Sequence, residues 1–419
     1  MMTPQAFFER AAQLDTADRL APLRAHFHVP PGVIYLDGNS LGLMPKAVPA
    51  RLAHVATGEW ATGLIRSWSQ AGWFDLPMTV GDRIAAIIGA GAAQVAVGDS
   101  TSVNLFKCLA AALHLRPGRP VILAEGNNFP SDSYMAAGLA ELVPGTQLQF
   151  LEPGEDLAAR LNRDGHRVAV VLLSHVDYRT AAVRDMARVN ALAHAAGALV
   201  LWDLSHTTGA VPCDLSGTGS DMAVGCSYKY LNGGPGAPAF AWIAPSMIEQ
   251  VQQPLAGWMG HAAPFGFTRD YQPAAGARRL VCGTPQVLSL VALDEALKIW
   301  DQVDRAALFA KSRQMTQFFV EAVQALCAPH RLRLICPSDP MHRGSHISFD
   351  LDEGGFEVMQ ALAARGVIGD FRGPVTMRFG FAPLYLSFRE VAQAVDHLKV
   401  ILDTREWDQA RYRVRGTVT

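Results

Sequence analysis

The most informative stretch of the sequence covers residues 221–236, DMAVGCSYKYLNGGPG. Its apolar start, residues 222–226, predicts a buried strand, and the glycines of residues 233–236 predict a turn. Lys229 therefore leaves a buried strand beside Tyr228. Burial disfavours the ammonium form of a lysine, and a neutral amine can form a Schiff base with an aldehyde. The alternative, a lysine that extends from a strand end into solvent, stays open at this point.

A carboxylate follows a second apolar run upstream, in LVLWDLSH, residues 199–206. Asp203 is expected at the carboxyl end of its strand, as Lys229 is, and ligands of open α/β sheets bind at that edge. Pyridoxal 5'-phosphate (PLP) uses both groups, a lysine for its aldehyde and an acid that keeps its ring nitrogen protonated. His206 would support the 3-oxygen side of the cofactor. The alternative for Asp203 is a helix N-cap. We therefore predict PLP as the cofactor.

Length and composition indicate a large core and exclude several classes of protein. The chain has 419 residues, half of them apolar, and a formal net charge of −2, which argues against a nucleic-acid partner. The charged, helix-patterned start and the lack of a long apolar run predict neither a secretion signal nor a membrane span. The six cysteines are scattered without a C-x-x-C pair, which predicts buried thiols in a reducing cytoplasm and no metal site. They are Cys108, Cys213, Cys226, Cys282, Cys327 and Cys336.

Apolar runs alternate with helical patterns or turns through the middle of the chain. This alternation predicts βαβ units and an α/β fold with a mostly parallel sheet. The runs are apolar throughout, as expected for strands that are covered on both faces. They occupy residues 120–124, 147–151, 168–173, 198–202, 222–226 and 239–243.

The pattern predicts two domains and an N-terminal segment. Residues 1–30 are expected to form a helical segment, residues 31–290 a large cofactor-binding domain, and residues 291–419 a small α+β domain. Thr284 and Pro285 predict the start of a helix at the boundary, as an N-cap followed by proline at the first helical position. Strands of the small domain are expected at residues 332–335, 346–351 and 376–380.

Two further groups of residues are candidates for cofactor contacts. Ser100, Thr101 and Ser102 open a predicted helix, where they form either a simple N-cap or a cradle for a phosphate. Phe129 and Asp132 follow the strand at residues 120–124. Phe129 would stack on the cofactor ring, or else belong to the core, and Asp132 would be a polar neighbour of the ring.

Arg378 lies within an otherwise apolar strand and therefore needs an anionic partner. A substrate α-carboxylate is one such partner and an internal ion pair is the alternative. Two other motifs carry no prediction. Residues 88–94, IGAGAAQ, lack the third glycine of a dinucleotide fingerprint. His342 and His346 flank Gly344 without an accompanying acid motif, so we predict no metal there.

Seven tracts occur in the order typical of one family. They are YLDGNSLGLMP (35–45), DSTSVNLFK (99–107), NFPSD (128–132), WDLSH (202–206), CSYKYLNGGPG (226–236), GW (257–258) and GTPQVLSL (283–290). Together they resemble the aspartate-aminotransferase-like, fold type I PLP enzymes, and among these the kynureninases. The WDLSH and SYKYLNGGPG tracts are the most specific of the set.

The resemblance implies a fold and an activity. The fold is a large domain with a mostly parallel seven-stranded sheet, followed by a smaller α+β domain. The activity is that of a hydrolase of carbon–carbon bonds in ketones, which cleaves L-kynurenine to anthranilate and L-alanine in tryptophan catabolism, the kynurenine pathway. The preference between kynurenine and its 3-hydroxy form, and a role in NAD biosynthesis, stay open. The resemblance also implies a homodimer with shared active sites.

The resemblance assigns roles to residues at matching positions. Lys229 is the Schiff-base lysine, Asp203 pairs with the ring nitrogen, and Arg378 holds the substrate carboxylate. Further cofactor contacts are Ser174 and His206, and Tyr228 is the candidate proton carrier. The ring is flanked by Phe129, Pro130, Ser131 and Asp132. The phosphate end is bound by Thr101, Ser102, Tyr228, Trp258 and Thr284, the last two from the neighbouring subunit.

Two rival functions remain. A cysteine desulfurase or selenocysteine lyase has the same fold, but it needs a mobile nucleophilic cysteine, and none stands in an obvious active-site loop. A PLP-dependent sensor that binds the cofactor without turnover normally carries a DNA-binding helix-turn-helix module. The roughly 30 residues before the first predicted strand leave little room for such a module.

Overall fold

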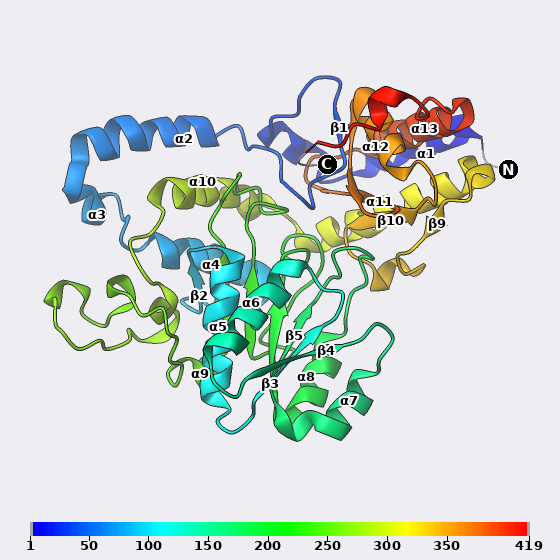
Figure 1. The fold of residues 1–419 in the computed structure, drawn as a ribbon. Helices are drawn as coiled ribbons and strands as arrows, with labels where there is room; N and C mark the ends of the chain where they lie inside the picture. The colour runs from blue at the N-terminus through cyan, green and yellow to red at the C-terminus, as the bar shows by residue number, and fades with distance from the viewer. Residues whose placement is uncertain (1–2, 417–419) are drawn as a thin grey trace. The chain divides into compact units, whose positions relative to one another are not determined.

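The computed structural model describes residues 3–416, which divide into two compact units (Figure 1). Unit 1 contains the described parts of Met1–Lys46, Arg179–Val183 and Ile299–Thr419. Unit 2 contains Ala47–Tyr178 and Arg184–Lys298. None of the helices in the described part of the chain combines the length and the apolar character that a membrane span requires.

A seven-stranded sheet forms the centre of unit 2, in the order β2-β8-β7-β6-β5-β3-β4. The strands are β2 (Val95–Val97), β3 (Val121–Glu125), β4 (Gln147–Leu151), β5 (Val168–Ser174), β6 (Leu199–Asp203), β7 (Met222–Gly225) and β8 (Phe240–Ile243). Only β8 runs antiparallel to its neighbours, β2 and β7. The prediction of a mostly parallel seven-stranded sheet is therefore confirmed, although the sequence pattern identified no strand at β2.

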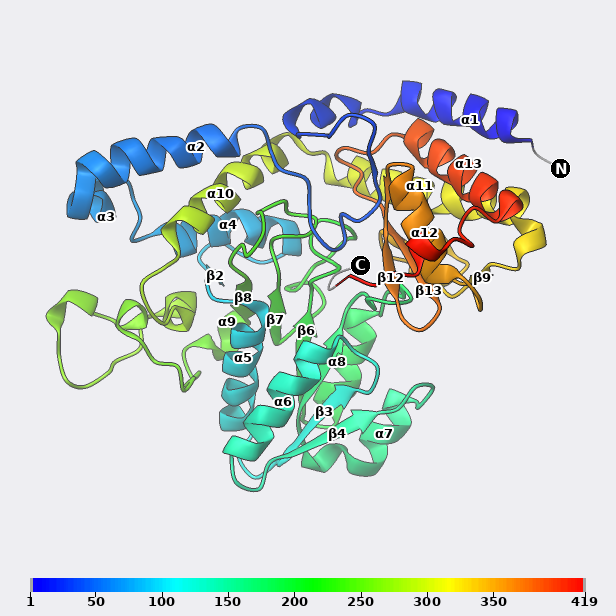
Figure 2. The same cartoon turned by 45° about the horizontal axis from the view of Figure 1, so that its top comes forward.

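Helices cover both faces of this sheet, which explains why its strands are apolar throughout. On one face, α5 (Thr101–Leu115) and α6 (Pro130–Leu142) pack against alternate strand residues such as Leu172 and Leu201 (Figure 2). The opposite face is covered by α8 (Met186–Ala195), whose Asn190 side chain accepts a hydrogen bond from Trp202 Nε1 at 3.0 Å. α7 (Leu157–Asp164) contacts α8.

Unit 2 contains several further helices. They are α2 (Val48–His54), the π-helix η2 (Val55–Gly63), α3 (Ser67–Gln70), α4 (Leu76–Ile88), α9 (Pro245–Ile248), α10 (Val287–Leu297) and the 3-10 helices η3 (Leu64–Arg66), η4 (Gly165–Arg167), η5 (Trp258–Gly260), η6 (Pro264–Gly266) and η7 (Gly276–Leu280). The predicted helix start at Thr284 and Pro285 is wrong, because α10 begins at Val287. The reason is that Gln286 keeps a ψ of 76°, which is not helical, so Pro285 cannot be the first helical residue.

Unit 1 contains a four-stranded antiparallel sheet in the order β12-β13-β10-β9 and a parallel pair, β1-β11. These strands are β1 (Ile34–Tyr35), β9 (Arg333–Leu334), β10 (His346–Asp350), β11 (Val367–Ile368), β12 (Asp370–Arg372) and β13 (Thr376–Gly380). The α-helices are α1 (Pro4–Ala17), α11 (Arg305–Leu326), α12 (Gly355–Ala364) and α13 (Phe388–Thr404), and the 3-10 helices are η1 (Ala21–His26), η8 (Lys298–Gln302), η9 (Ala328–His330), η10 (Pro340–His342) and η11 (Ala410–Tyr412). Both α1 and α11 pack against α13.

The compact units do not follow the predicted boundaries at residues 30 and 290. The first 46 residues group with the C-terminal segment, because α1 packs on α13 and β1 pairs with β11. A short segment, Arg179–Val183, also joins unit 1, where Ser348 Oγ donates to the Arg179 carbonyl at 2.6 Å. Pairing between segments that are distant in the sequence decides this grouping. A pattern of apolar and polar residues along the chain does not show which distant segments pair.

Candidate active site

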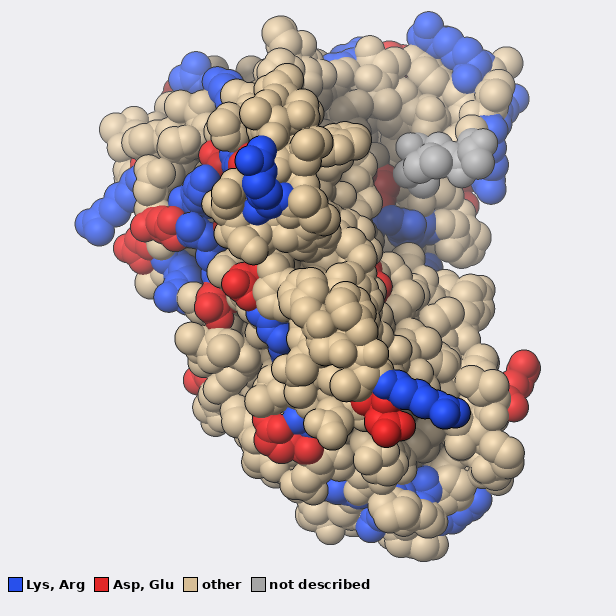
Figure 3. Space-filling view, turned by 90° about the vertical axis from the view of Figure 1, so that its left-hand side faces the viewer, with Lys and Arg blue, Asp and Glu red and all other residues tan. Residues whose placement is uncertain are grey.

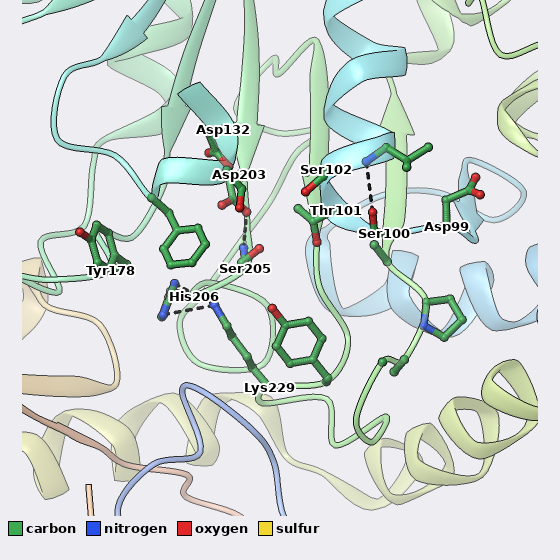
Figure 4. Close-up of a pocket in the computed structure, with 18 of the residues that line it drawn as sticks. Asp99, Ser100, Thr101, Ser102, Asp132, Tyr178, Asp203, Ser205, His206 and Lys229 are labelled. Atoms are coloured by element: carbon green, nitrogen blue, oxygen red, sulfur yellow. Dashed lines mark hydrogen bonds between the residues drawn. The ribbon is translucent and has the colours of Figure 1, made fainter. Parts of the chain in front are cut away.

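A cavity of about 500 Å³ lies in unit 2, at the carboxyl ends of the central strands and beside the start of α5 (Figure 4). Ten of the residues predicted as cofactor contacts line it: Thr101, Ser102, Phe129, Ser131, Asp132, Ser174, Asp203, His206, Tyr228 and Lys229. They come from segments that follow β2, β3, β5, β6 and β7. The parallel strands bring their ends to one edge of the sheet, which is why residues so far apart in sequence share one cavity.

The glycine-rich turn after β7 holds Lys229 in this cavity. Gly233 N donates to the Ser227 carbonyl at 2.9 Å and Asn232 N donates to the Lys229 carbonyl at 3.0 Å, so the chain folds back directly after the lysine. A Cβ atom at Gly233 would stand 2.9 Å from side-chain atoms of Ala237 and Leu293, so any larger residue would force these neighbours to shift. Lys229 is half-buried, as expected for a lysine at the end of a buried strand.

The Lys229 amine faces aromatic and imidazole groups. Its Nζ atom lies 3.4 Å from both ring nitrogens of His206 and 6.0 Å from the centre of the Phe129 ring. The centre of the Tyr228 ring is 5.9 Å away. Figure 4 shows Lys229 and His206 pointing toward one another at one side of the cavity. The amine is therefore directed into the cavity.

Two buried carboxyl groups, Asp132 and Asp203, form another wall (Figure 4). Asp203 Oδ1 accepts from Ser205 N at 2.7 Å, which fixes the group at the end of β6. Asp132 Oδ2 accepts from Asn128 Nδ2 at 2.8 Å, and Asn128 Oδ1 accepts from Ser174 Oγ at 2.6 Å. A continuous chain of hydrogen bonds thus joins the ends of β3 and β5 and orients the Asp132 carboxyl group.

Burial changes the acidity of the groups in this wall. Desolvation raises the pKa of Asp132 well above its usual range, and the neighbouring Asp203 charge raises it further. Desolvation also raises the pKa of Asp203. The pKa of Tyr228 is raised by the nearby Cys226 and by burial, so this hydroxyl keeps its proton across the neutral range. A cation placed between the two carboxyl groups would offset the cost of ionising them.

The start of α5 forms the opposite side of the cavity. Ser100 is the N-cap and its Oγ accepts from Val103 N at 3.3 Å. Thr101 and Ser102 occupy the first helical positions, where backbone N–H groups have no partner within the helix and the helix dipole favours an anion. Of the two interpretations of this motif, the N-cap is therefore present, and the same geometry offers an anion cradle.

An aromatic pair closes the cavity beside Asp132. Phe129 is the N-cap residue of α6, and its ring makes an edge contact with Tyr178 at a centroid distance of 5.4 Å. Phe129 is 39% exposed, so it is not the core residue of the alternative interpretation. Ser131 lines the cavity, whereas Pro130 is exposed at the first helical position and is not among the lining residues.

Three predicted residues lie elsewhere. Trp258 and Thr284 are exposed and do not line the cavity of their own chain. Their predicted contact is with the cofactor of the neighbouring subunit, and it stays a prediction. Arg378 belongs to unit 1, where it is 1% exposed in β13. Its Nε donates to Asp370 Oδ1 at 2.8 Å and its Nη2 also donates to Asp370. The internal ion pair that the sequence left as the alternative for Arg378 is therefore present.

Sequence reasoning missed several residues of the cavity. Asn128 connects Asp132 with Ser174, and its only signal was its place in the NFPSD tract, directly after a strand. Tyr178 follows β5 without a motif, and Ser205 follows β6 within the WDLSH tract, which assigned it no role. Gln286 lines the cavity because the helix begins later than predicted.

This donor set fits PLP. The cavity combines a half-buried lysine amine, a buried acidic wall, an exposed aromatic ring and a helix start that offers N–H groups to an anion. These are the partners needed by an aldehyde, a cationic ring nitrogen, a pyridine face and a phosphate. The raised pKa values of the two acids are the observation that fits a ring nitrogen best, because a cation there would lower both.

Solved structures with the same fold are PLP enzymes. The apo structure of a cysteine desulfurase from Thermococcus onnurineus NA1 superposes with a TM-score of 0.78 at 17% identity, covering 91% of this chain and 98% of that chain. A C-DES variant with glycine covalently linked to its PLP cofactor gives 0.78 at 17% identity, covering 90% and 98%. At this identity the likeness concerns the fold alone, and it confirms the expected fold type I architecture.

Sequence comparison is more specific. A family model described as the kynureninase C-terminal domain matches residues 308–398. The kynureninase of Pseudomonas fluorescens is 49% identical over 411 residues, 97% of this chain and 98% of that protein. The kynureninase of Burkholderia pseudomallei (strain 1106a) is 47% identical over 416 residues, 98% of this chain and 99% of that protein. Such identity over both full lengths leaves one conclusion: this chain belongs to the kynureninase family.

Proposed function

We propose that this protein hydrolyses the Cβ–Cγ bond of L-kynurenine to give anthranilate and L-alanine, with PLP as its cofactor. The observation that carries the proposal is the cavity in which the Lys229 amine faces His206 opposite the acidic wall of Asp132 and Asp203. Relatives named kynureninase support the substrate, since they match almost the whole chain.

The cofactor contacts follow from the chemistry of each wall. Lys229 binds the aldehyde, and Asp203 with Asp132 faces the ring nitrogen. Thr101 and Ser102 hold the phosphate at the start of α5, with Tyr228 beside them. Phe129 covers the cofactor ring, and His206 and Ser174 are further polar contacts of the cofactor. When bound, the cofactor supplies an electron sink for the electron pair released at the substrate Cα.

Two side chains of the cavity can move protons. The Lys229 amine is directed into the cavity and is the group proposed to take the Cα proton of the substrate. Tyr228 keeps its proton because Cys226 and burial raise its pKa, so it is proposed as the proton donor at the substrate carbonyl oxygen. A water molecule then provides the hydroxyl group of the anthranilate carboxylate, and alanine retains the former Cβ as its methyl group.

Arg378 is proposed to bind the α-carboxylate of the substrate, as the resemblance implies. Its bidentate pairing with Asp370 shows that the guanidinium takes the planar fork geometry that a carboxylate requires. The same pairing favours a structural role, and the two roles make different predictions for kinetics. Both are tested below.

We further propose a homodimer in the cytoplasm. Large apolar side chains of unit 2 are exposed: Trp60, Leu64, Ile65, Trp258, Phe265 and Phe267. Ile65 is 79% exposed and Phe267 is 80% exposed, which is typical of an interface rather than of a free surface. The side of the molecule on which α2, α3 and the segment of η5 and η6 lie has broad areas without charged residues (Figure 3). Free thiols at all six cysteines suit a reducing compartment.

Activity is tested with purified protein, PLP and L-kynurenine, with anthranilate followed by its fluorescence and alanine by mass spectrometry. Lys229→Ala is expected to abolish turnover, by about 10³-fold or more, because it removes both the aldehyde partner and the proposed base. Lys298→Ala, at an exposed lysine of unit 2, is the matched control and should keep normal rates. Near-normal anthranilate production by Lys229→Ala would contradict the assignment. The 3-hydroxy substrate is assayed alongside.

The acidic wall predicts a pH dependence of the apoprotein. An unfolded aspartate loses its proton near pH 4, whereas Asp132 keeps its proton in the native state up to a higher pH. The unfolded state then binds fewer protons, so the free energy of unfolding falls as pH rises through this window. Asp132→Asn should flatten that decline in urea unfolding measured from about pH 4 to 8.

The difference in slope between the wild type and Asp132→Asn reports the contribution of Asp132 alone. Asp37 in unit 1, whose pKa burial raises to about 7, contributes the same decline to both proteins. An identical slope for the wild type and Asp132→Asn would rule out a proton held by Asp132 in the native apoprotein.

The role of Arg378 is tested by Arg378→Lys beside Asp370→Asn. If the guanidinium binds the substrate carboxylate, Arg378→Lys should raise KM for L-kynurenine by about 10- to 100-fold, because lysine cannot form the bidentate pair. Steady-state kinetics and thermal unfolding are measured on each variant. A lower Tm for both variants, with KM unchanged in Arg378→Lys, would leave only the internal ion pair.

Shared active sites are tested by mixing two inactive variants, Lys229→Ala and Trp258→Ala. If Trp258 serves the partner subunit, a mixed dimer has one site with both residues intact and one with neither. Equal mixing after subunit exchange should therefore restore about one quarter of the wild-type activity. Mixing without exchange is the control. No recovery in a verified mixed dimer would mean that Trp258 acts within its own chain.

A further inference from the structure

Lys107 is a lysine in the interior of unit 2 whose side chain is only 1% exposed. It lies on α5, two turns after the helix start that carries Thr101 and Ser102. Its Nζ atom donates to Asp99 Oδ2 at 2.5 Å, to the Leu280 carbonyl at 2.6 Å and to Asn104 Oδ1 at 3.3 Å. An ammonium group has three donors, so all three are used. A buried ammonium group needs such polar partners to offset the cost of its removal from water.

Asp99, the ionic partner of Lys107, belongs to the wall of the active-site cavity. It stands immediately before the N-cap Ser100, and Figure 4 shows its side chain beyond Ser100. Its backbone has a φ of +54°, and its carbonyl accepts from Ala239 N at 3.0 Å. Only Ser100 lies between Asp99 and Thr101, so the Cα atoms of these two residues are at most about 8 Å apart, given 3.8 Å between consecutive Cα atoms.

A carboxylate at that position opposes the proposed function of the helix start. A phosphate at Thr101 and Ser102 carries negative charge, and Asp99 lines the same cavity. Like charges in one cavity repel one another, and salt screens this repulsion only beyond a Debye length of about 8 to 10 Å. An uncompensated Asp99 would repel the phosphate and cancel part of the favourable helix dipole. The Lys107 ammonium removes that repulsion through the 2.5 Å contact.

The contact of Lys107 with the Leu280 carbonyl joins α5 to the segment that precedes Thr284. Leu280 ends η7, and the chain after it runs against the start of η5, where Met259 N donates to the Cys282 carbonyl at 3.3 Å. The two backbones approach so closely that a side chain at Gly257 would stand 1.9 Å from the Cys282 carbonyl oxygen. Lys107 thus bonds to two segments, the one at the start of α5 and the one at Leu280.

We propose that Lys107 is a positioning residue for the phosphate end of the active site: it neutralises Asp99 beside the anion cradle of Thr101 and Ser102. The inference rests on the proposed function of that cradle. It differs from a purely structural role, because neutralisation acts on ligands that carry a phosphate and not on ligands that lack one.

Unit 1 offers a matched control for the structural role. Lys311 is 6% exposed at its side chain, and its Nζ lies 2.7 Å from Asp18 Oδ2 and donates to the Pro383 carbonyl at 2.6 Å. Lys311→Met therefore removes a buried ion pair of the same construction that does not belong to the cofactor cavity. Both substitutions are expected to lower Tm, since Lys311→Met leaves the buried Asp18 and Lys107→Met leaves the half-buried Asp99 without a cationic partner.

The test measures the dissociation constants of PLP and of pyridoxal, which lacks the phosphate, with full-length apoprotein. Lys107→Met should raise the dissociation constant of PLP by about tenfold or more while that of pyridoxal changes by less than about twofold. Lys311→Met should change neither by more than about twofold. Adding Asp99→Asn to Lys107→Met should restore most of the PLP affinity, because the unpaired charge is then absent.

Asp99→Asn alone keeps the protein testable if Lys107→Met does not fold. This variant leaves the Lys107 charge in place and should bind PLP at least as tightly as the wild type. Three results would overturn the proposal: equal losses of PLP and pyridoxal affinity in Lys107→Met, no rescue by Asp99→Asn, or a selective loss of PLP affinity in Asp99→Asn alone. A wild type that binds both ligands equally would overturn it as well, together with the cradle. Failure of kynurenine turnover would leave it standing, because binding is measured without substrate.

Discussion

The burial of Asp132 next to Asp203 is the constraint on which the site depends. Burial raises the pKa of both carboxyl groups, and the charge of Asp203 raises the pKa of Asp132 further. Ionising both groups in the empty cavity is therefore unfavourable. The Ser174–Asn128–Asp132 chain of hydrogen bonds keeps the arrangement from relaxing toward solvent. Such a wall is unfavourable in an empty protein and favourable around a cation, so it prepares the site for a positively charged ring.

The opposite walls follow from the backbone. The turn after β7 folds tightly because Gly233 fits between Ala237 and Leu293, and this fold sends the Lys229 amine into the cavity. The start of α5 directs N–H groups and a dipole to the far side. A ligand with an aldehyde, a basic ring and a phosphate therefore meets a different kind of group on each side, which fixes its orientation as well as its affinity.

Charge compensation is the common element of these walls. Asp132 and Asp203 form a wall that favours a cation, whereas the start of α5 favours an anion. Asp99 lies beside the start of α5 and is paired with Lys107. In both places a carboxylate close to the ligand is tolerated because a specific positive group accompanies it. A buried ion pair contributes little net folding stability, and the Lys107–Asp99 pair differs from the Lys311–Asp18 pair in that Asp99 lines the cofactor cavity.

The sequence by itself determined the architecture of the sheet and most of the cavity. Apolar runs separated by helical patterns predicted the parallel strands, and LVLWDLSH with SYKYLNGGPG predicted Asp203, His206 and Lys229 at their ends. This works because strand burial and glycine turns are local properties, and because the parallel order brings strand ends to one edge without further information.

Only the tertiary structure decided the partners. Asn128, Gln286 and Lys107 lie in tracts that carry the family resemblance, but the sequence assigned none of them a role. Asn128 bonds to Ser174 and Lys107 bonds to Leu280, both far along the chain, and Gln286 lines the cavity. The ion pair of Arg378 with Asp370 and the grouping of α1 with α13 likewise depend on pairing across sequence distance. The sequence shows which residues are apolar or charged. It does not show which partner a charged residue has, because many partners are possible until the packing of the fold brings one of them into contact.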